Sequence, residues 1–238
     1  MVILVADSPK HGSGEIYRLL RRRVLEGGLP PATKVNIQHL ATELNTSATP
    51  VREALRQLQG DGLLLATSHK GYATTDVLDR AGVKSLFEFR LLIEPWAASV
   101  AATDSLRNPA RELEREIKAF NPAMDSVRHA MIYHDSRFHG RILAASENSL
   151  VIDAYEKSHC HLHLFRMIGE HWDWRASLTQ HQEIQSAIAR ADSTGAEEAM
   201  RSHLHQAYEG FMSELEPLAE SKEKLREPSS PRIISKKS

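Results

Sequence analysis

The residues with the clearest chemical potential are an aspartate and several histidines in the second half of the chain. Asp135 and His139 are four residues apart, so on a helix their side chains would lie on one face, one turn apart. His181 and His203 follow in later segments that also show helical periodicity. Three imidazoles and one carboxylate from three helices could close on one divalent cation. Such ligands suit Zn, Ni, Fe or Mn better than an ion that prefers thiolates.

Spacing alone does not single out this set of ligands. His159 and His163 are also four residues apart, so they match the pattern equally well. Ten of the thirteen histidines lie after residue 75, which makes chance pairs of this kind common there. Taken singly, each of these histidines is more simply explained as a surface or packed residue.

A second group of residues, near the N-terminus, is suited to nucleic acid. Arg52 and Arg56 are one helical turn apart, opposite an apolar face, and their planar guanidinium groups could pair with guanine or clamp phosphate. Ser47 and Thr49, at the start of the same helix, could reach phosphate together with the helix N-terminus. The tip of a predicted hairpin adds two residues that could reach the minor groove or the backbone, His69 and Lys70. The simpler interpretation is a solvated helix face and an ordinary hairpin.

The elements that would position these side chains change that balance. We expect a first helix that ends at Gly27-Gly28, a second that starts at Asn36, and a third that starts near Thr49-Pro50. Two short strands should follow at 63–67 and 72–75, joined by a turn at 68–71. Helix, helix, short turn, helix and hairpin is the order of a winged helix-turn-helix.

The rest of the chain shows no strand pattern from residue 77 onward. The sequence therefore predicts a mainly α protein, in which the winged helix-turn-helix is followed by an all-helical antiparallel bundle domain. The predicted organisation is a flexible leader (1–13), a DNA-binding domain (14–76), a helical domain (77–216) and a disordered tail (217–238). Helices of the second domain are expected at 83–102, 109–119, 124–146, 149–170, 178–191 and 195–215.

Composition and charge agree with a protein of the cytoplasm that binds DNA. The formal net charge of -1 hides an asymmetry, because residues 1–75 hold nine Lys/Arg and six Asp/Glu while the remainder is acidic. Cys160 is the single cysteine, so no disulfide can form within the chain, as expected in a reducing compartment. No stretch approaches the ~18 apolar residues of a membrane span, and we expect no membrane partner.

The N-terminal third resembles the DNA-binding domain of the GntR family. The similarity covers about residues 14–75 and is most specific in Ser47-x-x-Pro-Val-Arg-Glu-Ala-Leu, followed by Asp61-Gly62-Leu63 and Lys70-Gly71-Tyr72. The resemblance implies an operator of double-stranded DNA as partner. Two positions differ from the family pattern. Ala48 replaces an arginine that reads the operator, a loss of about 1–3 kcal/mol of base discrimination, and Ala32 stands where a glycine is usual.

The helical domain resembles the FCD ligand-binding domain of the FadR-type subfamily, over about residues 80–215. The similarity lies in Asp135-Ser-Arg-Phe-His139, in Gln180-His-Gln-Glu-Ile184 and in Ala199-Met-Arg-Ser-His203. The resemblance chooses among the histidines, because the family holds its metal with an aspartate, the histidine four residues later and two later histidines. It thus implies a divalent metal on Asp135, His139, His181 and His203.

The same resemblance implies a small carboxylate effector beside the metal. Arg90 stands where the family has an arginine that pairs with the effector, and a guanidinium can hold a carboxylate through two hydrogen bonds. Otherwise Arg90 would be explained as a helix-surface ion pair with Glu94, which is worth only a few tenths of a kcal/mol. Asn148 and Arg166 are further candidates for the pocket. The histidines of 159–163 are better explained as polar groups at the pocket wall than as a second metal site.

The leading functional hypothesis is a homodimeric transcription regulator whose DNA affinity responds to the effector. Two recognition helices would read half-sites about one helical turn apart. A metal-dependent hydrolase is the alternative from another class, although the sequence offers no general base for it. A third possibility is a regulator whose metal only braces the fold. The sequence does not give the effector, the native metal, the operator, the regulated genes or the direction of regulation.

Overall fold

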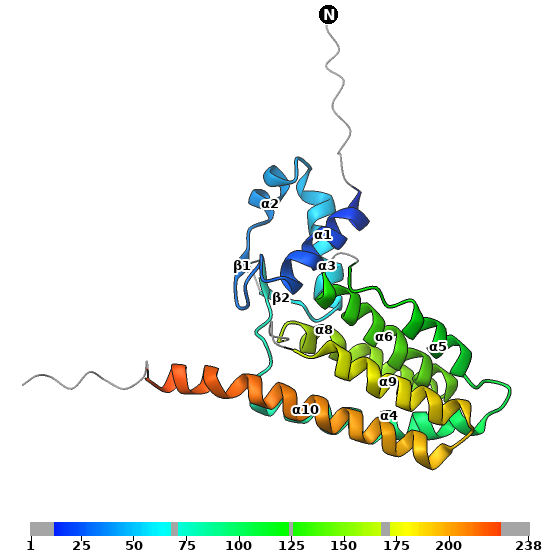
Figure 1. Cartoon of the computed structure of the whole chain (residues 1–238). Coiled ribbons are helices and arrows are strands. Elements are labelled where there is room, and N and C mark those ends of the chain that lie inside the picture. Colours follow the sequence, from blue (N-terminus) through cyan, green and yellow to red (C-terminus); the bar gives the residue numbers. More distant parts are fainter. Residues whose placement is uncertain (1–11, 68–70, 124–125, 168–171, 225–238) are drawn as a thin grey trace, which may run out of the picture.

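The computed structural model describes residues 12–67, 71–123, 126–167 and 172–224 of the chain. A small N-terminal head lies above a larger helical body (Figure 1). The head and the body match the predicted class, a winged helix-turn-helix followed by an all-helical bundle. None of the described helices is long and apolar enough to cross a membrane.

The head contains three helices around a compact apolar core. Its helices are α1 (Ser13–Leu25), α2 (Ile37–Glu43) and α3 (Ala48–Gly60). α3 buries one apolar stripe against α1, as its helical periodicity predicts. The predicted N-cap residue Asn36 accepts a hydrogen bond from the backbone N–H of His39, which fixes the start of α2. The buried residues of α3 are Val51, Ala54, Leu55 and Leu58.

The wing is a three-stranded antiparallel sheet, one strand more than the predicted hairpin. β2 (Leu64–Thr67) and β3 (Gly71–Thr74) form that hairpin, and β1 (Lys34–Val35) pairs with the other edge of β3. A strand of two residues is too short to show any periodicity, which is why the sequence does not predict it. Ala32, just before β1, has a φ of 53°, the left-handed conformation that glycine adopts without strain.

The body consists of helices that run back and forth beside one another. The long helices α4 (Arg80–Thr103) and α10 (Ser193–Lys224) pack along each other, and α9 (Trp174–Ala189) packs against both (Figure 1). One apolar core links these helices with α5 and α6, and Phe87 and Phe138 are among its fully buried residues. The helices are α4 (Arg80–Thr103), α5 (Ala110–Lys118), α6 (Val127–Ala145), α7 (Ser149–Ser158), α8 (Cys160–Phe165), α9 (Trp174–Ala189) and α10 (Ser193–Lys224).

Three of the predicted helix boundaries in the body are wrong. The single helix expected at 149–170 is interrupted at His159, whose φ of 47° ends α7 and starts α8. α9 begins at residue 174 instead of 178, because the side chain of Asp173 accepts hydrogen bonds from the N–H groups of Arg175 and Ala176. α10 continues through Pro217 to residue 224, so residues 217–224 of the predicted tail are helical. The helix formers that follow Pro217 outweigh the hydrogen bond that it removes.

The head rests on α6 and α8 of the body. Ile132, Leu162 and Phe165 come from these two helices, yet they belong to the apolar core of the head. Arg166 joins the two parts by donating hydrogen bonds to the backbone oxygen (2.6 Å) and the hydroxyl (2.8 Å) of Thr75. Gly62 of the head is so close to α8 that a Cβ there would lie 3.5 Å from the ring of His163. The head is therefore packed onto the body and not merely tethered to it.

Candidate metal centre and adjacent cavity

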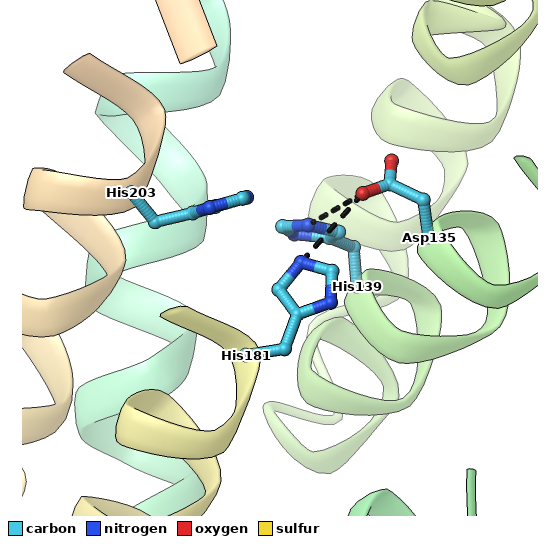
Figure 2. A group of neighbouring side chains, drawn as sticks. All are labelled: Asp135, His139, His181 and His203. Atoms are coloured by element: carbon cyan, nitrogen blue, oxygen red, sulfur yellow. Dashed lines mark ion pairs between the residues drawn. The ribbon is translucent and has the colours of Figure 1, made fainter. Parts of the chain in front are cut away.

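Asp135, His139, His181 and His203 converge on one point inside the body (Figure 2). Asp135 and His139 lie one turn apart on α6, while α9 and α10 supply one histidine each. One ligand atom from each residue can be chosen so that all four atoms lie within 4.8 Å of one another. Asp135 Oδ1 lies 3.4 Å from Nε2 of His139 and 3.7 Å from Nε2 of His181. The predicted ligand set is thus brought together closely enough that it could hold one metal ion.

A second layer of side chains engages the opposite nitrogen of each imidazole. Glu94 Oε2 lies 2.6 Å from Nδ1 of His139, at ion-pair distance but without hydrogen-bond geometry. Gln180 Oε1 accepts a hydrogen bond of 2.7 Å from Nδ1 of His203. Nδ1 of His181 also faces a side chain, that of His134. Because all three Nδ1 atoms have a neighbour of this kind, the three Nε2 atoms remain for a shared ion.

His134 is the third member of this layer, and no pattern in the sequence indicates it. Its Nε2 lies 2.8 Å from Nδ1 of His181. Its own Nδ1 faces Glu116 at 3.8 Å, and Glu116 is in turn held by Arg137 and Arg141. Among the described residues, these contacts form a chain from the surface arginines to the metal-ligand candidate His181.

Electrostatics favour a cation in the middle of this cluster. Burial alone would lower the pKa of His139, but the carboxylates of Glu94 and Asp135 outweigh burial and raise it to about 9. Burial alone would raise the pKa of Asp135, yet the charge of His139 beside it holds that pKa well below its usual range. Burial lowers the pKa of His203 to about 3, so its imidazole is neutral near pH 7 and available as a ligand.

Two buried ring nitrogens support the fit of a metal to these residues. Nε2 of His139 and Nε2 of His181 are buried without a hydrogen-bond partner among the described residues. Buried polar atoms of this kind are rare in folded proteins unless a water or an ion completes them. Three imidazoles and a carboxylate are donors suited to Zn, Ni, Fe or Mn. The residues present therefore fit a divalent transition metal.

A cavity of about 360 Å³ opens beside this cluster and is lined by Asp135, His203 and Arg90. Arg90, on α4, is almost fully buried, with 3% of its surface exposed. Its Nε donates a hydrogen bond of 2.5 Å to Glu94 Oε1, and a second guanidinium nitrogen reaches Oε2 at 3.2 Å. The Arg90–Glu94 pair considered from the sequence exists, but it is buried beside the cavity and not on the helix surface.

Of the remaining candidates for the pocket, some line the cavity and others do not. His161 lines the cavity, as expected for part of the 159–163 run. Asn148 does not line it, because this residue is exposed and caps the N-terminus of α7 by accepting from the N–H of Val151. Arg166 does not line it either, because its guanidinium is committed to Thr75 at the junction with the head. Among the described lining residues, neither Asn148 nor Arg166 has a place in this cavity.

Helix α3, the predicted recognition helix of the head, exposes the two predicted arginines. Arg52 and Arg56 are exposed on α3, on the side away from its buried stripe. Ser47 is the N-cap residue of α3, and its hydroxyl makes no capping hydrogen bond. Thr49, in the first turn, is exposed as well. His69 and Lys70, expected at the tip of the wing, lie outside the described residues.

Several second-layer residues escaped the sequence analysis for physical reasons. Gln180 precedes His181 directly, so it cannot share the face of that ligand, and its partner His203 is 23 residues away. His134 likewise has its partner 47 residues away, on another helix. Only Glu94 carried a local signal, its spacing of one turn from Arg90. Contacts between helices of this kind leave no periodic trace in one sequence.

Comparison with known proteins agrees with both halves of this arrangement. The profile of the gntR family of bacterial regulatory proteins matches residues 13–73, and that of the FCD domain matches residues 85–206. A transcriptional regulator of Bacillus subtilis, YdhC, is 24% identical over 216 residues, which is 88% of this chain and 95% of that protein. The HTH-type transcriptional repressor RspR of Escherichia coli is 26% identical over 198 residues, 82% of this chain and 86% of that protein.

Solved structures show the same fold. A transcriptional regulator from Rhodococcus superimposes with a TM-score of 0.65 at 21% identity, covering 84% of this chain and 97% of that one. McbR/YncC of Escherichia coli gives a TM-score of 0.62 at 19% identity, with the same coverage. The two family profiles together account for the reading head and for the helical body with its histidine cluster. The chain therefore belongs to the GntR family of transcriptional regulators, in the group that carries an FCD domain.

Proposed function

We propose that this regulator binds a divalent transition metal at Asp135, His139, His181 and His203. We also propose that a small carboxylate bound beside the metal controls the affinity of the protein for operator DNA. The observation that carries this proposal is the composition of one cavity wall. The cavity is lined by Arg90, Asp135 and His203, and also by Ile132 and Phe165, which belong to the apolar core of the head. A molecule in the cavity would thus touch the side chains on which the DNA-binding head rests.

The metal would supply a Lewis-acidic anchor for one carboxylate oxygen. Arg90 would hold the carboxylate from the side of α4, with Glu94 fixing the orientation of its guanidinium. Ile132 and Phe165 would repack when the cavity fills, which shifts the balance between two placements of the head. Such a shift is limited by the difference in effector affinity between the two placements.

Metal binding is tested by titrating the chelator-treated protein with Zn²⁺ or Mn²⁺ and measuring the melting temperature and the bound metal. We expect the metal to raise the melting temperature, because it binds only the folded cluster. His203→Ala should abolish both effects. His205→Ala is the matched control, since it removes an exposed histidine two residues further along α10. A cluster that takes up no metal in the wild type contradicts the proposal.

Control by an effector is tested on DNA from upstream of the protein's own gene. Fluorescence anisotropy of the labelled DNA gives the affinity of the metal-loaded protein with and without small carboxylic acids. We expect at least one acid to change the affinity, and His203→Ala to bind DNA without that response. If metal loading changes stability while no acid changes the affinity, the metal is structural and the sensing role is wrong. RspR is named a repressor, and we propose repression here too.

We also propose that the protein acts as a homodimer joined through α4. Leu92 and Trp96 lie one turn apart on this helix and are 77% and 41% exposed. An exposed apolar stripe on a long helix suits a contact with a second copy of itself. Leu92→Glu should yield monomers in light scattering, whereas Leu106→Glu, at a leucine 92% exposed elsewhere, should not. Equal masses for both variants would contradict this interface.

A further inference from the structure

We infer that the effector is a monocarboxylate with an apolar body, and that the cavity discriminates against dicarboxylates. This inference rests on the proposed function, because it describes the ligand of the same cavity. It depends on which charges line the cavity and where they lie, not on the presence of a histidine cluster. The cavity, at about 360 Å³, is near the lower end of the range for ligand pockets, roughly 300–1,000 Å³, so the ligand is small.

Positive charge is confined to the buried end of the cavity. Among the described lining residues, Arg90 is the only lysine or arginine, and it shares its charge with Glu94. The metal would be partly balanced by Asp135, so the buried end keeps about one uncompensated positive charge. His161 does not add a second cation, because burial lowers its pKa to about 4. One carboxylate therefore neutralises the site.

Negative charge is found on the exposed part of the lining. Asp173 and Glu214 both line the cavity and both are exposed. A second carboxylate on the ligand would meet these two acids instead of a cation, and like charges at short range oppose binding. If it turned inward instead, it would be buried without a partner, which is more costly still. Both placements act against a dicarboxylate.

The rest of the wall favours hydrocarbon over polar groups. Two of the polar lining residues already make hydrogen bonds within the wall. Gln180 accepts one from His203 and donates one to Gln206. Ser177, Ser213 and His161 are the uncharged polar side chains that remain among the described lining residues, while most of the others are apolar or aromatic. A polyhydroxylated acid would therefore leave some of its hydroxyl groups unpaired. The large apolar lining residues are Met131, Ile132, Leu164, Phe165, Trp172 and Phe211.

Calorimetric titration of the metal-loaded full-length protein at about pH 7.5 tests this class. Each monocarboxylate is paired with a dicarboxylate of the same skeleton: hexanoate with adipate, benzoate with phthalate, and 3-phenylpropionate with phenylsuccinate. We expect at least one monoacid to bind, and its diacid to bind at least about tenfold more weakly. A diacid that binds as tightly as its monoacid overturns the inference but leaves the sensing role standing. If no acid of either kind binds, the proposed effector site itself is wrong.

A second variant separates the rim charges from the shape of the cavity. Asp173→Asn combined with Glu214→Gln removes both acids, while the introduced asparagine can still cap α9. Diacid binding should strengthen several-fold in this variant while monoacid binding stays within about twofold. The control is Asp153→Asn with Glu156→Gln, which removes two exposed acids from α7, outside the cavity lining. Equal effects of the two double variants on diacid binding would show that the rim does not select the ligand.

Discussion

Glu94 Oε2 lies 2.6 Å from Nδ1 of His139, while the same carboxylate receives two hydrogen bonds from Arg90. One buried carboxylate therefore connects the candidate metal ligand with the candidate effector arginine. Burial alone would raise the pKa of Glu94, but the charge of Arg90, followed by that of His139, lowers it to about 2. Glu94 is thus an anion at any pH at which the protein is expected to work, and both of its partners depend on it.

The first prediction concerns Arg90 and the choice of substitution there. Arg90→Ala should lower the free energy of unfolding by about 3–5 kcal/mol, because it removes the larger of the two counter-charges of the buried Glu94 and leaves only His139 beside it. Arg90→Lys keeps a positive charge but cannot offer two parallel hydrogen bonds, so it should fold, bind metal and lose roughly tenfold or more in carboxylate affinity. Calorimetry and melting temperatures of the two variants measure this. Unchanged carboxylate affinity in a folded Arg90→Lys protein removes Arg90 from the effector site.

The second prediction concerns His134 as a positioning residue. When Nε2 of His181 binds a metal, its Nδ1–H needs an acceptor, and Nε2 of His134 is 2.8 Å away. His134→Ala should weaken metal affinity by about 10–100-fold. His134→Gln supplies an amide oxygen and should restore most of the loss. Competition with a chromophoric chelator gives these affinities. If Gln and Ala are equally weak while both proteins remain folded, His134 fills space and does not orient His181.

The third prediction concerns stability against pH. Burial lowers the pKa of His161 to about 4, while an unfolded histidine titrates near ~6.5. Between these values the unfolded chain binds more protons, so the folded protein loses stability as the pH falls. In urea unfolding of the metal-free protein, this loss between pH 7.5 and pH 5 should be about 2 kcal/mol smaller in His161→Asn than in the wild type. His205→Asn, at an exposed histidine, should lose as much as the wild type.

The fourth prediction concerns α3, the predicted recognition helix. Arg52→Ala and Arg56→Ala should each reduce operator affinity by about 1–3 kcal/mol if the arginine reads a base. If it contacts phosphate, binding should weaken for all sequences and the salt dependence should decrease by about one counterion. Anisotropy titrations at several salt concentrations distinguish these cases. Arg111→Ala removes an exposed arginine from α5 of the body and should change neither quantity. Unaltered binding by both α3 variants would falsify the assignment of α3 as the recognition helix.

The fifth prediction concerns the turn before β1. Ala32 has a φ of 53°, a backbone conformation that is strained for a residue with a Cβ. Its side chain is exposed, so removing the Cβ costs no packing. Ala32→Gly should raise the free energy of unfolding by about 0.5–1 kcal/mol, the relief of strain minus the extra entropy of an unfolded glycine. Ala123→Gly is the control, since Ala123 is exposed without a positive φ. A gain of equal size in both variants would show that the turn is not strained.

The parts of the fold that the sequence predicted are those with a local signal. The apolar stripe of α3 and the N-cap Asn36 of α2 placed the head correctly, because periodicity and capping act within one helix. The four candidate ligands followed from a family resemblance, and the structure brings them together. The break at His159, where φ is 47°, was missed, because histidine is not among the glycine, proline and asparagine residues that mark helix ends in a sequence. The partners of Arg166 and His134 lie on other elements and left no pattern at all.

The interruption at His159 has a consequence for how such a regulator can change over time. It creates a helix of only six residues, α8, in which Leu164 is next to the cavity and Leu162 lies in the core of the head. Phe165 belongs to both sets, so under the proposed function a substitution there would alter ligand contact and the packing of the head together. The facing wall, from α9 and α10, contributes no described residue to the core of the head, so there the proposed ligand contacts could change alone. We expect adaptive variation to concentrate on that wall, while α8 diversifies slowly.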